Sequence, residues 1–323
     1  MTGLIARAPT RLDFGGGWTD VPPYSDEEGG FVCNIALARY ATVRVRASDD
    51  AAGTVDTQRA ADTALAEAAV RRAGVDGIAV ELSSDFPLAA GLGGSSAAGV
   101  AVSGALATWR GSPIDRTALA EQSRAIEVED LGVPGGRQDH YAAAYGGALA
   151  LTFGDGTQVT RVPLSPSLKA TLERRCIVAY TGQSRISGDT ITAVLDAYGR
   201  RERNVLAALA CMKALAREMA DALAGGDIDA LGALVGEHWR HQRSLHPAIP
   251  TARIDAIVER GTAAGAVGCK ALGASGGGCV LLVAGEERAH AVREAVAPLG
   301  RLLTFTLDTE GVRWWTEGDG GRE

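Results

Sequence analysis

The sequence has 323 residues, more than one hydrophobic core usually spans, which favours two closely packed domains. Hydrophobic residues make up 46% and charged residues 22% of the chain, as in ordinary globular proteins and unlike disordered or fibrous ones. The 32 Lys and Arg residues against 39 Asp and Glu residues give a formal net charge of −7 with no basic block, which argues against nucleic acid and anionic membranes as partners.

The five cysteines are odd in number, scattered, and never form a CxxC pair. This usage favours reduced, buried thiols in a cytoplasmic protein. The N-terminal stretch MTGLIARAPTRLDFGG interrupts any apolar run with two arginines and a proline, and no later run reaches membrane-spanning length. We therefore expect a cytoplasmic location.

The first half of the chain predicts strands and helices in alternation. Strand patterns cover 31–47 and 77–83, and an Ala-rich helical pattern covers 60–73 between them. A glycine cluster at 91–94 precedes a helical pattern that runs to Trp109. We expect a glycine loop that leads directly into a helix.

A second helix is predicted from a capping Asp115 to a stop near Gly132. The sequence YGGALALTF then predicts a strand, and the polar stretch 153–170 is a candidate domain boundary. We therefore predict an N-terminal domain over residues 1–165 and a C-terminal domain over residues 166–323.

The second half mixes helices and strands without strict βαβ repetition. Extended or strand-like segments are predicted at 175–181, 278–284 and 301–309. Helices are predicted across 188–224, 227–245, 250–264 and 286–298. This order favours an α+β fold over a doubly wound parallel sheet.

The strongest chemical signal is PLAAGLGGSSAAG, residues 87–99. Backbone N–H groups of such a loop can converge on an anion, and the dipole of the following helix favours negative charge, so phosphate is the expected ligand. A hydroxyl such as Ser96 beside that phosphate can also ligate magnesium. The alternative is a tight turn with an N-cap serine. Because the loop is neither GxGxxG nor GxxxxGKS/T, a Rossmann dehydrogenase and a P-loop NTPase are disfavoured.

This loop resembles the ATP-phosphate motif of the GHMP kinases, the family of galactokinase, homoserine kinase and mevalonate kinase. ARAPTRLDFGGGWTDV at 6–21 resembles the family's N-terminal substrate motif, and KALGASGGGC at 270–279 resembles its glycine-rich C-terminal motif. The three motifs stand in the family's order and spacing across nearly the whole chain. The resemblance implies ATP and Mg²⁺ as cofactors. It also implies an N-terminal domain related to a ribosomal S5-like fold, a ferredoxin-like C-terminal domain and an active site between them.

The resemblance implies two catalytic residues. Asp139 in GGRQDHY matches the catalytic aspartate of related sugar kinases, where a carboxylate can accept the proton of the attacking hydroxyl. The alternative is a loop aspartate that caps the following helix. Arg11 resembles the family's arginine near the reacting centre, which can offset phosphoryl charge or hold the aspartate ionised. The alternative is a surface arginine on a strand.

The implied substrate contacts lie mostly in GGWTD, and they are Gly17, Trp18, Thr19 and Asp20. Asp20 matches an aspartate that hydrogen-bonds sugar hydroxyls, and Trp18 could stack on the sugar face; a turn aspartate and a core tryptophan are the alternatives. A substrate that already carries a phosphate needs a cation to receive it. Arg185 in YTGQSR, Arg240 and Arg243 are the candidates, and the sequence does not decide among them.

The ATP phosphates are expected at the glycine loop and at the C-terminal glycine motif. The implied residues are Gly91, Leu92, Gly93, Gly94, Ser95, Ser96, Ala97, Gly276 and Gly277. Lys270, at the start of the second motif, could be no more than a solvated charge.

For magnesium we expect Ser96 and one carboxylate from the helix before the catalytic loop. Glu127 and Glu129 are two positions apart and cannot face the same site on a helix, and the spacing to the catalytic aspartate favours Glu129. His238 and His241 lie three apart and could share a helix face as metal ligands. No third ligand has suitable spacing, which disfavours zinc.

The resemblance to individual subfamilies is divided. VPPYSDEEGG, GGRQDHYAAAYGG, YTGQSR and HWRHQRSL are similar to kinases of D-glycero-D-manno-heptose 7-phosphate, whereas the tryptophan in GGWTD is similar to L-fucokinase. Both phosphorylate the anomeric oxygen, so we expect a sugar 1-kinase, with the heptose phosphate preferred and L-fucose as the alternative. A kinase of mevalonate or homoserine and a catalytically silent ATP- and sugar-binding regulator are further alternatives. A homodimer is left open.

Overall fold

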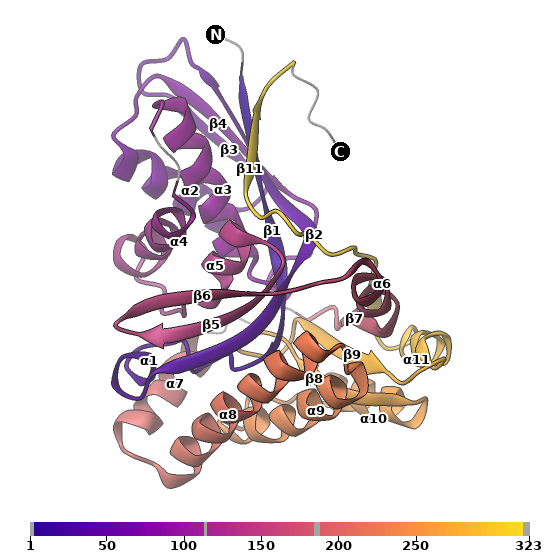
Figure 1. Ribbon diagram of the computed structural model, residues 1–323. Coiled ribbons are helices and arrows are strands. Elements are labelled where there is room, and N and C mark those ends of the chain that lie inside the picture. The colour runs from indigo at the N-terminus through magenta and orange to yellow at the C-terminus, as the bar shows by residue number, and fades with distance from the viewer. Residues whose placement is uncertain (1–2, 113–114, 184–187, 319–323) are drawn as a thin grey trace.

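The computed structural model describes residues 3–112, 115–183 and 188–318. Within these residues the strands form two sheets, and helices pack against both of them (Figure 1). Helices and strands are mixed without βαβ repetition, which confirms the predicted α+β class. No helix of the described part is long and apolar enough to cross a membrane.

The first sheet has seven described strands in the order β11-β1-β2-β4-β3, with β5 joining β2 and β6 joining β5. Their bounds are β1 (Leu4–Gly15), β2 (Gly30–Ala47), β3 (Thr54–Thr57), β4 (Ile78–Ser84), β5 (Ala148–Gly154), β6 (Gly156–Val162) and β11 (Arg313–Thr316). The long strand β2 pairs along one edge with β1, while its other edge is shared between β5 near its start and β4 near its end. This sharing lets one strand hold both halves of the sheet.

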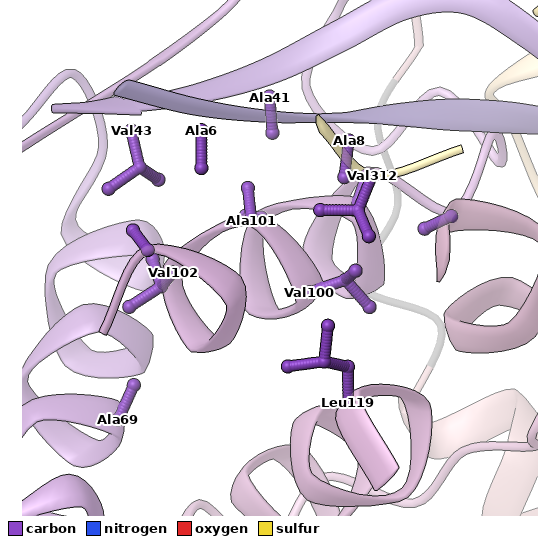
Figure 2. Close-up of a cluster of buried hydrophobic side chains, with 14 of the residues drawn as sticks. Ala6, Ala8, Ala41, Val43, Ala69, Val100, Ala101, Val102, Leu119 and Val312 are labelled. Atoms are coloured by element: carbon purple, nitrogen blue, oxygen red, sulfur yellow. The ribbon is translucent and has the colours of Figure 1, made fainter. Parts of the chain in front are cut away.

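Helices cover one face of this sheet, and the central one approaches it closely. They are α2 (Ala60–Ala73), α3 (Gly94–Trp109), α4 (Arg116–Ala125) and α5 (Gln138–Tyr145). Figure 2 shows small side chains of β1 and β2, among them Ala6, Ala8 and Ala41, facing Ala101 of α3, while Val100 of the same helix lies near Leu119. Because both surfaces are built from short side chains, α3 packs tightly on the sheet, which fixes where its N-terminal end lies.

The second sheet is antiparallel, in the order β10-β7-β9-β8. Its strands are β7 (Cys176–Tyr180), β8 (Ala266–Ala271), β9 (Cys279–Ala284) and β10 (Arg301–Leu303). The helices of this half are α6 (Pro166–Arg175), α7 (Gly188–Gly199), α8 (Arg203–Gly225), α9 (Ile228–Ser244), α10 (Ala252–Ala263) and α11 (Ala289–Val296), and a short α1 (Tyr24–Glu27) follows β1. Every residue of β9 is buried, because both faces of the sheet are covered.

Most predicted elements are present in the structure, and three of them differ from the prediction in their bounds or in their division. The helix predicted from Asp115 divides into α4 and a π-helical turn, η1 (Ile126–Asp130). Asp115 caps α4 as predicted, by accepting a hydrogen bond from the Thr117 N–H. The helix predicted across 188–224 is two helices, α7 and α8. The strand predicted at 301–309 ends at Leu303, because the chain then leaves the second sheet.

The last segment returns to the first sheet. Leu307 forms a bridge with Leu37, and β11 pairs with β1, beside which it lies in Figure 1. The predicted division between residues 165 and 166 stays a prediction, but a simple cut there would separate β11 from the sheet it completes. All five cysteines are unpaired, as expected, yet Cys211 is exposed, so the prediction of buried thiols was wrong for this one.

Candidate active site

One pocket, with a volume of about 620 Å³, opens where the end of β1, the start of α3 and the turn before α5 meet. Its walls include the glycine loop at 91–94, the segment 17–21 and the turn 133–136. Two half-exposed apolar side chains, Leu88 and Val133, also line it. Gly273 and Ala274 of the C-terminal glycine motif complete the wall, so the three motifs of the sequence meet in one cavity.

The glycine loop presents an uncapped helix end to the pocket. Gly93 adopts a left-handed φ of +71°, and Ala97 is the first residue whose N–H bonds back into the loop, to the Gly93 carbonyl oxygen at 2.9 Å. No described side chain caps α3. The N–H groups at the start of the helix therefore lack intrahelical partners, which is the arrangement that binds phosphate.

The C-terminal glycine motif supports this loop by backbone contact. The Cys279 N–H donates to the Ala90 carbonyl oxygen at 2.8 Å, and a Cβ on Gly91 would lie 2.5 Å from the Leu272 carbonyl oxygen. Gly273 and Ala274 line the pocket. Of the predicted phosphate residues, Gly276, Gly277 and Ala97 are buried and are not among the described residues that form the pocket wall.

Asp139 and Arg11 form the centre of the site. Arg11 donates two hydrogen bonds to the Asp139 carboxylate, from Nε to Oδ1 at 2.7 Å and from Nη2 to Oδ2 at 2.9 Å. Its Nη1 donates to the Gly91 carbonyl oxygen at 2.5 Å. Arg11 is almost fully buried, so it is not the surface residue of the alternative interpretation. It fixes the carboxylate relative to the glycine loop.

Gly93 is in direct contact with this carboxylate, since a Cβ at Gly93 would lie 3.0 Å from the Asp139 Cγ. We expect Gly93→Ala to lower kcat by about 10- to 100-fold, because the methyl group displaces Asp139 and alanine strains the left-handed backbone. Gly74→Ala is the matched control: Gly74 has a similar φ of +61° with nothing within 4 Å of its Cβ position. Equal losses of kcat in the two variants would attribute the effect to backbone strain alone.

The π-helical turn η1 separates the two glutamates proposed for magnesium. Glu127 lines the pocket and accepts hydrogen bonds from the hydroxyls of Ser95 at 2.7 Å and Ser96 at 3.3 Å. Glu129 points elsewhere and pairs with Arg72 at 2.9 Å. The expectation that Glu129 accompanies Ser96 is therefore corrected in favour of Glu127, because the two side chains leave η1 on different faces.

His140 holds the Glu127 carboxylate from behind. Its Nε2 lies 3.1 Å from Glu127 Oε2 and 3.3 Å from Ser96 Oγ, and its Nδ1 lies 2.9 Å from Ser123 Oγ. Burial raises the pKa of the Glu127 carboxyl, but the hydrogen bonds from His140 and the two serines outweigh it, so the net shift is downward. Glu127 is therefore held as a carboxylate. The sequence analysis missed His140, whose only signal was its place beside Asp139.

The substrate motif forms the other end of the pocket. Trp18 and Asp20 line it and are buried, and Trp18 has a strained φ of +81°, which is typical of functional sites. Asp20 accepts a hydrogen bond from the Gln138 N–H at 3.0 Å. Gly17 also lines the pocket, whereas the Thr19 hydroxyl donates to the Gly16 carbonyl oxygen at 2.7 Å and holds the loop together. Thr19 is therefore not among the described pocket residues.

Burial raises the pKa of Asp20 to about 6, and the nearby Asp139 and Asp13 add to the effect. The hydrogen bond from Gln138 opposes it. The turn before α5 must also pass close to Asp20, because any Cβ on Gly136 would overlap the Asp20 carboxylate. Gly136 is a further position that the sequence analysis did not single out.

Lys270 and Asp13 form an ion pair beneath this end of the pocket. Lys270 Nζ donates to Asp13 Oδ2 at 2.8 Å, and Lys270 is fully buried, so its interpretation as a solvated charge was wrong. Burial lowers the pKa of Lys270, while Asp13 counteracts the shift. Asp13 was missed in the sequence. It stands two residues after Arg11 on β1 and therefore projects from the same face of the strand.

The histidine pair does not form a metal site. His238 is fully buried and its Nε2 accepts a hydrogen bond from the Gly16 N–H at 2.8 Å, while His241 lies beside Glu237. Burial and the nearby Lys270 lower the pKa of His238 well below its usual value. A neutral His238 therefore anchors the substrate loop. Within the described residues no group of three or more His, Cys, Asp or Glu side chains could hold a metal ion on its own.

The arginines proposed for a substrate phosphate are not brought together. Arg185 lies outside the described residues. Arg240 pairs with Glu237 at 2.7 Å and Arg243 with Asp255 at 2.9 Å, and neither is among the described residues of the pocket wall.

Two family models match the chain: GHMP kinases N terminal domain over residues 58–147, and GHMP kinases C terminal over residues 219–300. The D-glycero-alpha-D-manno-heptose 7-phosphate kinase of Campylobacter jejuni is 26% identical over 98% of this chain and 99% of its own. The galactokinase of Mycobacterium bovis is 30% identical over 84% of this chain and 88% of its own. These matches confirm the family predicted from the three motifs.

Among solved structures, a D-glycero-D-manno-heptose 1-phosphate kinase from Bacteroides thetaiotaomicron superimposes with a TM-score of 0.79 and 23% sequence identity. The superposition covers 97% of this chain and 99% of the other. At this identity the likeness establishes the fold.

Proposed function

Because the chain belongs to the GHMP kinase family and is a sugar kinase, we propose that it transfers the γ-phosphoryl group of Mg-ATP to the anomeric hydroxyl of a sugar. The preferred acceptor is D-glycero-D-manno-heptose 7-phosphate, the substrate named for the Campylobacter jejuni relative. The observation that carries the proposal is the Asp139 carboxylate, held by Arg11 against the uncapped glycine loop. This arrangement places a proton acceptor next to a phosphate cradle.

The residues at the glycine loop fit a magnesium-bound triphosphate. The free N–H groups at the start of α3 suit the phosphates, and Glu127 with Ser96 supplies the oxygen ligands that magnesium prefers. One protein carboxylate is sufficient, because magnesium usually completes its shell with phosphate oxygens and water. When bound, the ion neutralises charge on the β- and γ-phosphates. His140 and Ser123 orient the ligands from behind.

The apolar wall of the pocket fits the nucleotide base. Phe86 lies beside the glycine loop, and the half-exposed Leu88 and Val133 give the apolar lining that an aromatic ligand needs. This placement leaves the opposite end, at Trp18 and Asp20, for the sugar.

In the reaction the anomeric oxygen forms a bond to the γ-phosphorus, and the bond between that phosphorus and the β–γ bridging oxygen breaks. The proton of the anomeric hydroxyl passes to an Asp139 carboxylate oxygen. Each guanidinium nitrogen of Arg11 donates a hydrogen bond, Nε and Nη2 to Asp139 and Nη1 to the Gly91 carbonyl oxygen, so Arg11 serves to position the base. Alignment and fixed charges supply most of the rate enhancement.

The direct test is ADP release with Mg-ATP and a panel of D-glycero-D-manno-heptose 7-phosphate, L-fucose, galactose, N-acetylhexosamines and mevalonate, with phosphorus NMR of each product. We expect an anomeric phosphate on the heptose. An anomeric phosphate on fucose would replace the heptose by the alternative sugar. Slow ATP turnover that no sugar or alcohol stimulates would support the silent regulator instead.

The raised pKa of Asp20 predicts a pH dependence for sugar recognition. An ionised Asp20 accepts strong hydrogen bonds from sugar hydroxyls, and protonation weakens them, so we expect kcat/KM for the sugar to rise with pH through about 6 and then level off. Asp20→Asn should lower kcat/KM and remove this step from the profile. A step of unchanged position in the variant would assign the titration to another group.

The raised pKa of Asp20 also predicts how the stability of the fold changes with pH. Since the pKa of Asp20 in the folded protein is about 6, above its ordinary value of 3.8, the contribution of Asp20 to the free energy of unfolding is largest below pH 3.8 and is lost as the pH rises through 6. Asp20→Asn should therefore flatten this part of the stability profile, measured by urea unfolding between pH 4 and 7. Whether the protein forms a homodimer stays open and is testable by light scattering.

A further inference from the structure

The buried ion pair of Asp13, which lines the pocket, and Lys270 beneath it is not used by any step assigned above. Asp13 comes from β1 of the first sheet and Lys270 from β8 of the second, so the pair also joins the two halves. Burying two charges costs several kcal/mol per ion before their mutual attraction is counted, and apolar pairs often replace such ion pairs without loss of stability. Stability alone therefore gives little reason to place the pair there.

Asp13 keeps an unused acceptor at the sugar end. Its Oδ2 is held by Lys270, whereas its Oδ1 is buried and has no hydrogen-bond partner among the described residues. Asp13 itself is 3% exposed and lines the pocket. Leaving a buried charged acceptor unsatisfied is costly, so the site fits a ligand that brings a donor.

A second side chain with an unpartnered acceptor, Gln138, lies on the same side of the pocket as Asp13. Gln138 lines the pocket and is buried, and its Oε1 also lacks a partner among the described residues. A Cβ on Gly17 would lie 2.6 Å from Asp13 Oδ2 and 2.9 Å from Gln138 Nε2, so both side chains converge on the space that Gly17 leaves open. With Asp20, which also lines the pocket, this end presents two carboxylates and one side-chain amide.

We infer that Asp13 is a substrate-binding residue that accepts a hydrogen bond from a sugar hydroxyl, and that Lys270 is a positioning residue that fixes its carboxylate. The inference rests on the proposed function and deepens it. The group that meets Asp13, Asp20 and Gln138 is an uncharged hydroxylated part of the sugar, because two carboxylates repel an anion. A phosphate already present on the substrate must bind away from these three side chains.

The test compares the wild-type protein with Asp13→Leu/Lys270→Met, in which an apolar pair replaces the ion pair. Each is assayed with Mg-ATP, with the sugar that the wild type phosphorylates and with its monodeoxy analogues. We expect the double variant to lose about 10- to 100-fold in kcat/KM for the parent sugar, the range of a hydrogen bond to a charged group, with little change in KM for ATP.

The analogue that lacks the hydroxyl bound by Asp13 distinguishes substrate binding from a merely structural role. In the wild type, removing the hydroxyl that meets Asp13 should cost about 10- to 100-fold, whereas in the double variant the same deoxy sugar should react as well as the parent. A merely structural ion pair would lower kcat/KM by one common factor for every analogue, and that result would overturn the inference. So would an unchanged kcat/KM for the parent sugar.

Two further variants keep the test decisive. Asp13→Asn preserves the shape of the side chain. In this variant, removing the same hydroxyl should lower kcat/KM by a smaller factor than in the wild type, because a neutral amide accepts a weaker hydrogen bond. This variant replaces the double variant if the double variant fails to fold. Asp308→Asn alters another buried aspartate, paired with Arg313 away from the pocket, and should leave the analogue pattern as in the wild type. A wild-type protein that phosphorylates no panel member refutes the proposed function itself, whereas an active wild type without the coupling refutes only the assignment of Asp13.

Discussion

Asp139→Asn should lower kcat by about 10²- to 10⁴-fold while leaving Mg-ATP binding near its wild-type strength. An amide cannot accept the proton of the attacking hydroxyl, whereas the free N–H groups of the glycine loop are unchanged by the substitution. In the wild type, Arg11 donates two hydrogen bonds to the Asp139 carboxylate, at 2.7 Å and 2.9 Å. The amide oxygen of the variant can still accept one of them. The nucleotide site should therefore survive the loss of the base.

The measurements are single-turnover kinetics, titration with Mg-ADP, and the melting temperature. Asp130→Asn is the control. Asp130 ends η1, where it pairs with Arg72 of α2, and it is not among the described pocket residues. Its turnover should match the wild type. Comparable turnover by Asp139→Asn and the wild type would remove Asp139 from the mechanism, and a loss explained entirely by unfolding would appear as a lowered melting temperature.

Glu127→Gln should produce the second large effect, a loss of about 10- to 100-fold in activity at limiting magnesium. The amide weakens the charge interaction with the metal and loses the carboxylate geometry that Ser95, Ser96 and His140 stabilise. Raising the magnesium concentration should recover part of the activity, because the remaining oxygen and the phosphates still bind the ion.

Glu129→Gln is the matched comparison, since it makes the same chemical change two residues away. Glu129 pairs with Arg72 at the surface, so this variant should keep the wild-type magnesium dependence. Activity is measured by ADP release across a magnesium titration at fixed ATP. The reverse pattern, with Glu129→Gln impaired and Glu127→Gln normal, would restore the assignment that the sequence spacing favoured.

Local patterns predicted much of the fold correctly. The helix at 60–73 coincides with α2, and the strand at 31–47 differs from β2 by one residue at its start. Such elements were visible because their hydrophobic periodicity is carried by neighbouring residues. The error at 301–309 has the opposite origin, because the end of β10 is decided by the chain crossing to the first sheet, a long-range event.

The choice of the proposed magnesium carboxylate also depended on structure that the local sequence pattern does not reveal. On a regular α-helix over 115–132 only one of Glu127 and Glu129 could face the site, and the spacing to Asp139 favoured Glu129. The π-helical turn at Ile126–Asp130 changes the relation between residue number and side-chain direction. Its position depends on packing against α2 and α3, which no local pattern records.

The sequence by itself determined the family, the phosphate loop and the catalytic aspartate of the proposal, because each rests on a contiguous motif whose glycines and charged residue carry their own chemistry. Only the tertiary structure decided which side chains share the pocket. Asp13 and Lys270 stand 257 residues apart and reveal their relation only when β1 and β8 meet. The buried pair forms because the fold removes both charges from water, and sequence alone does not specify which charges lose their solvent.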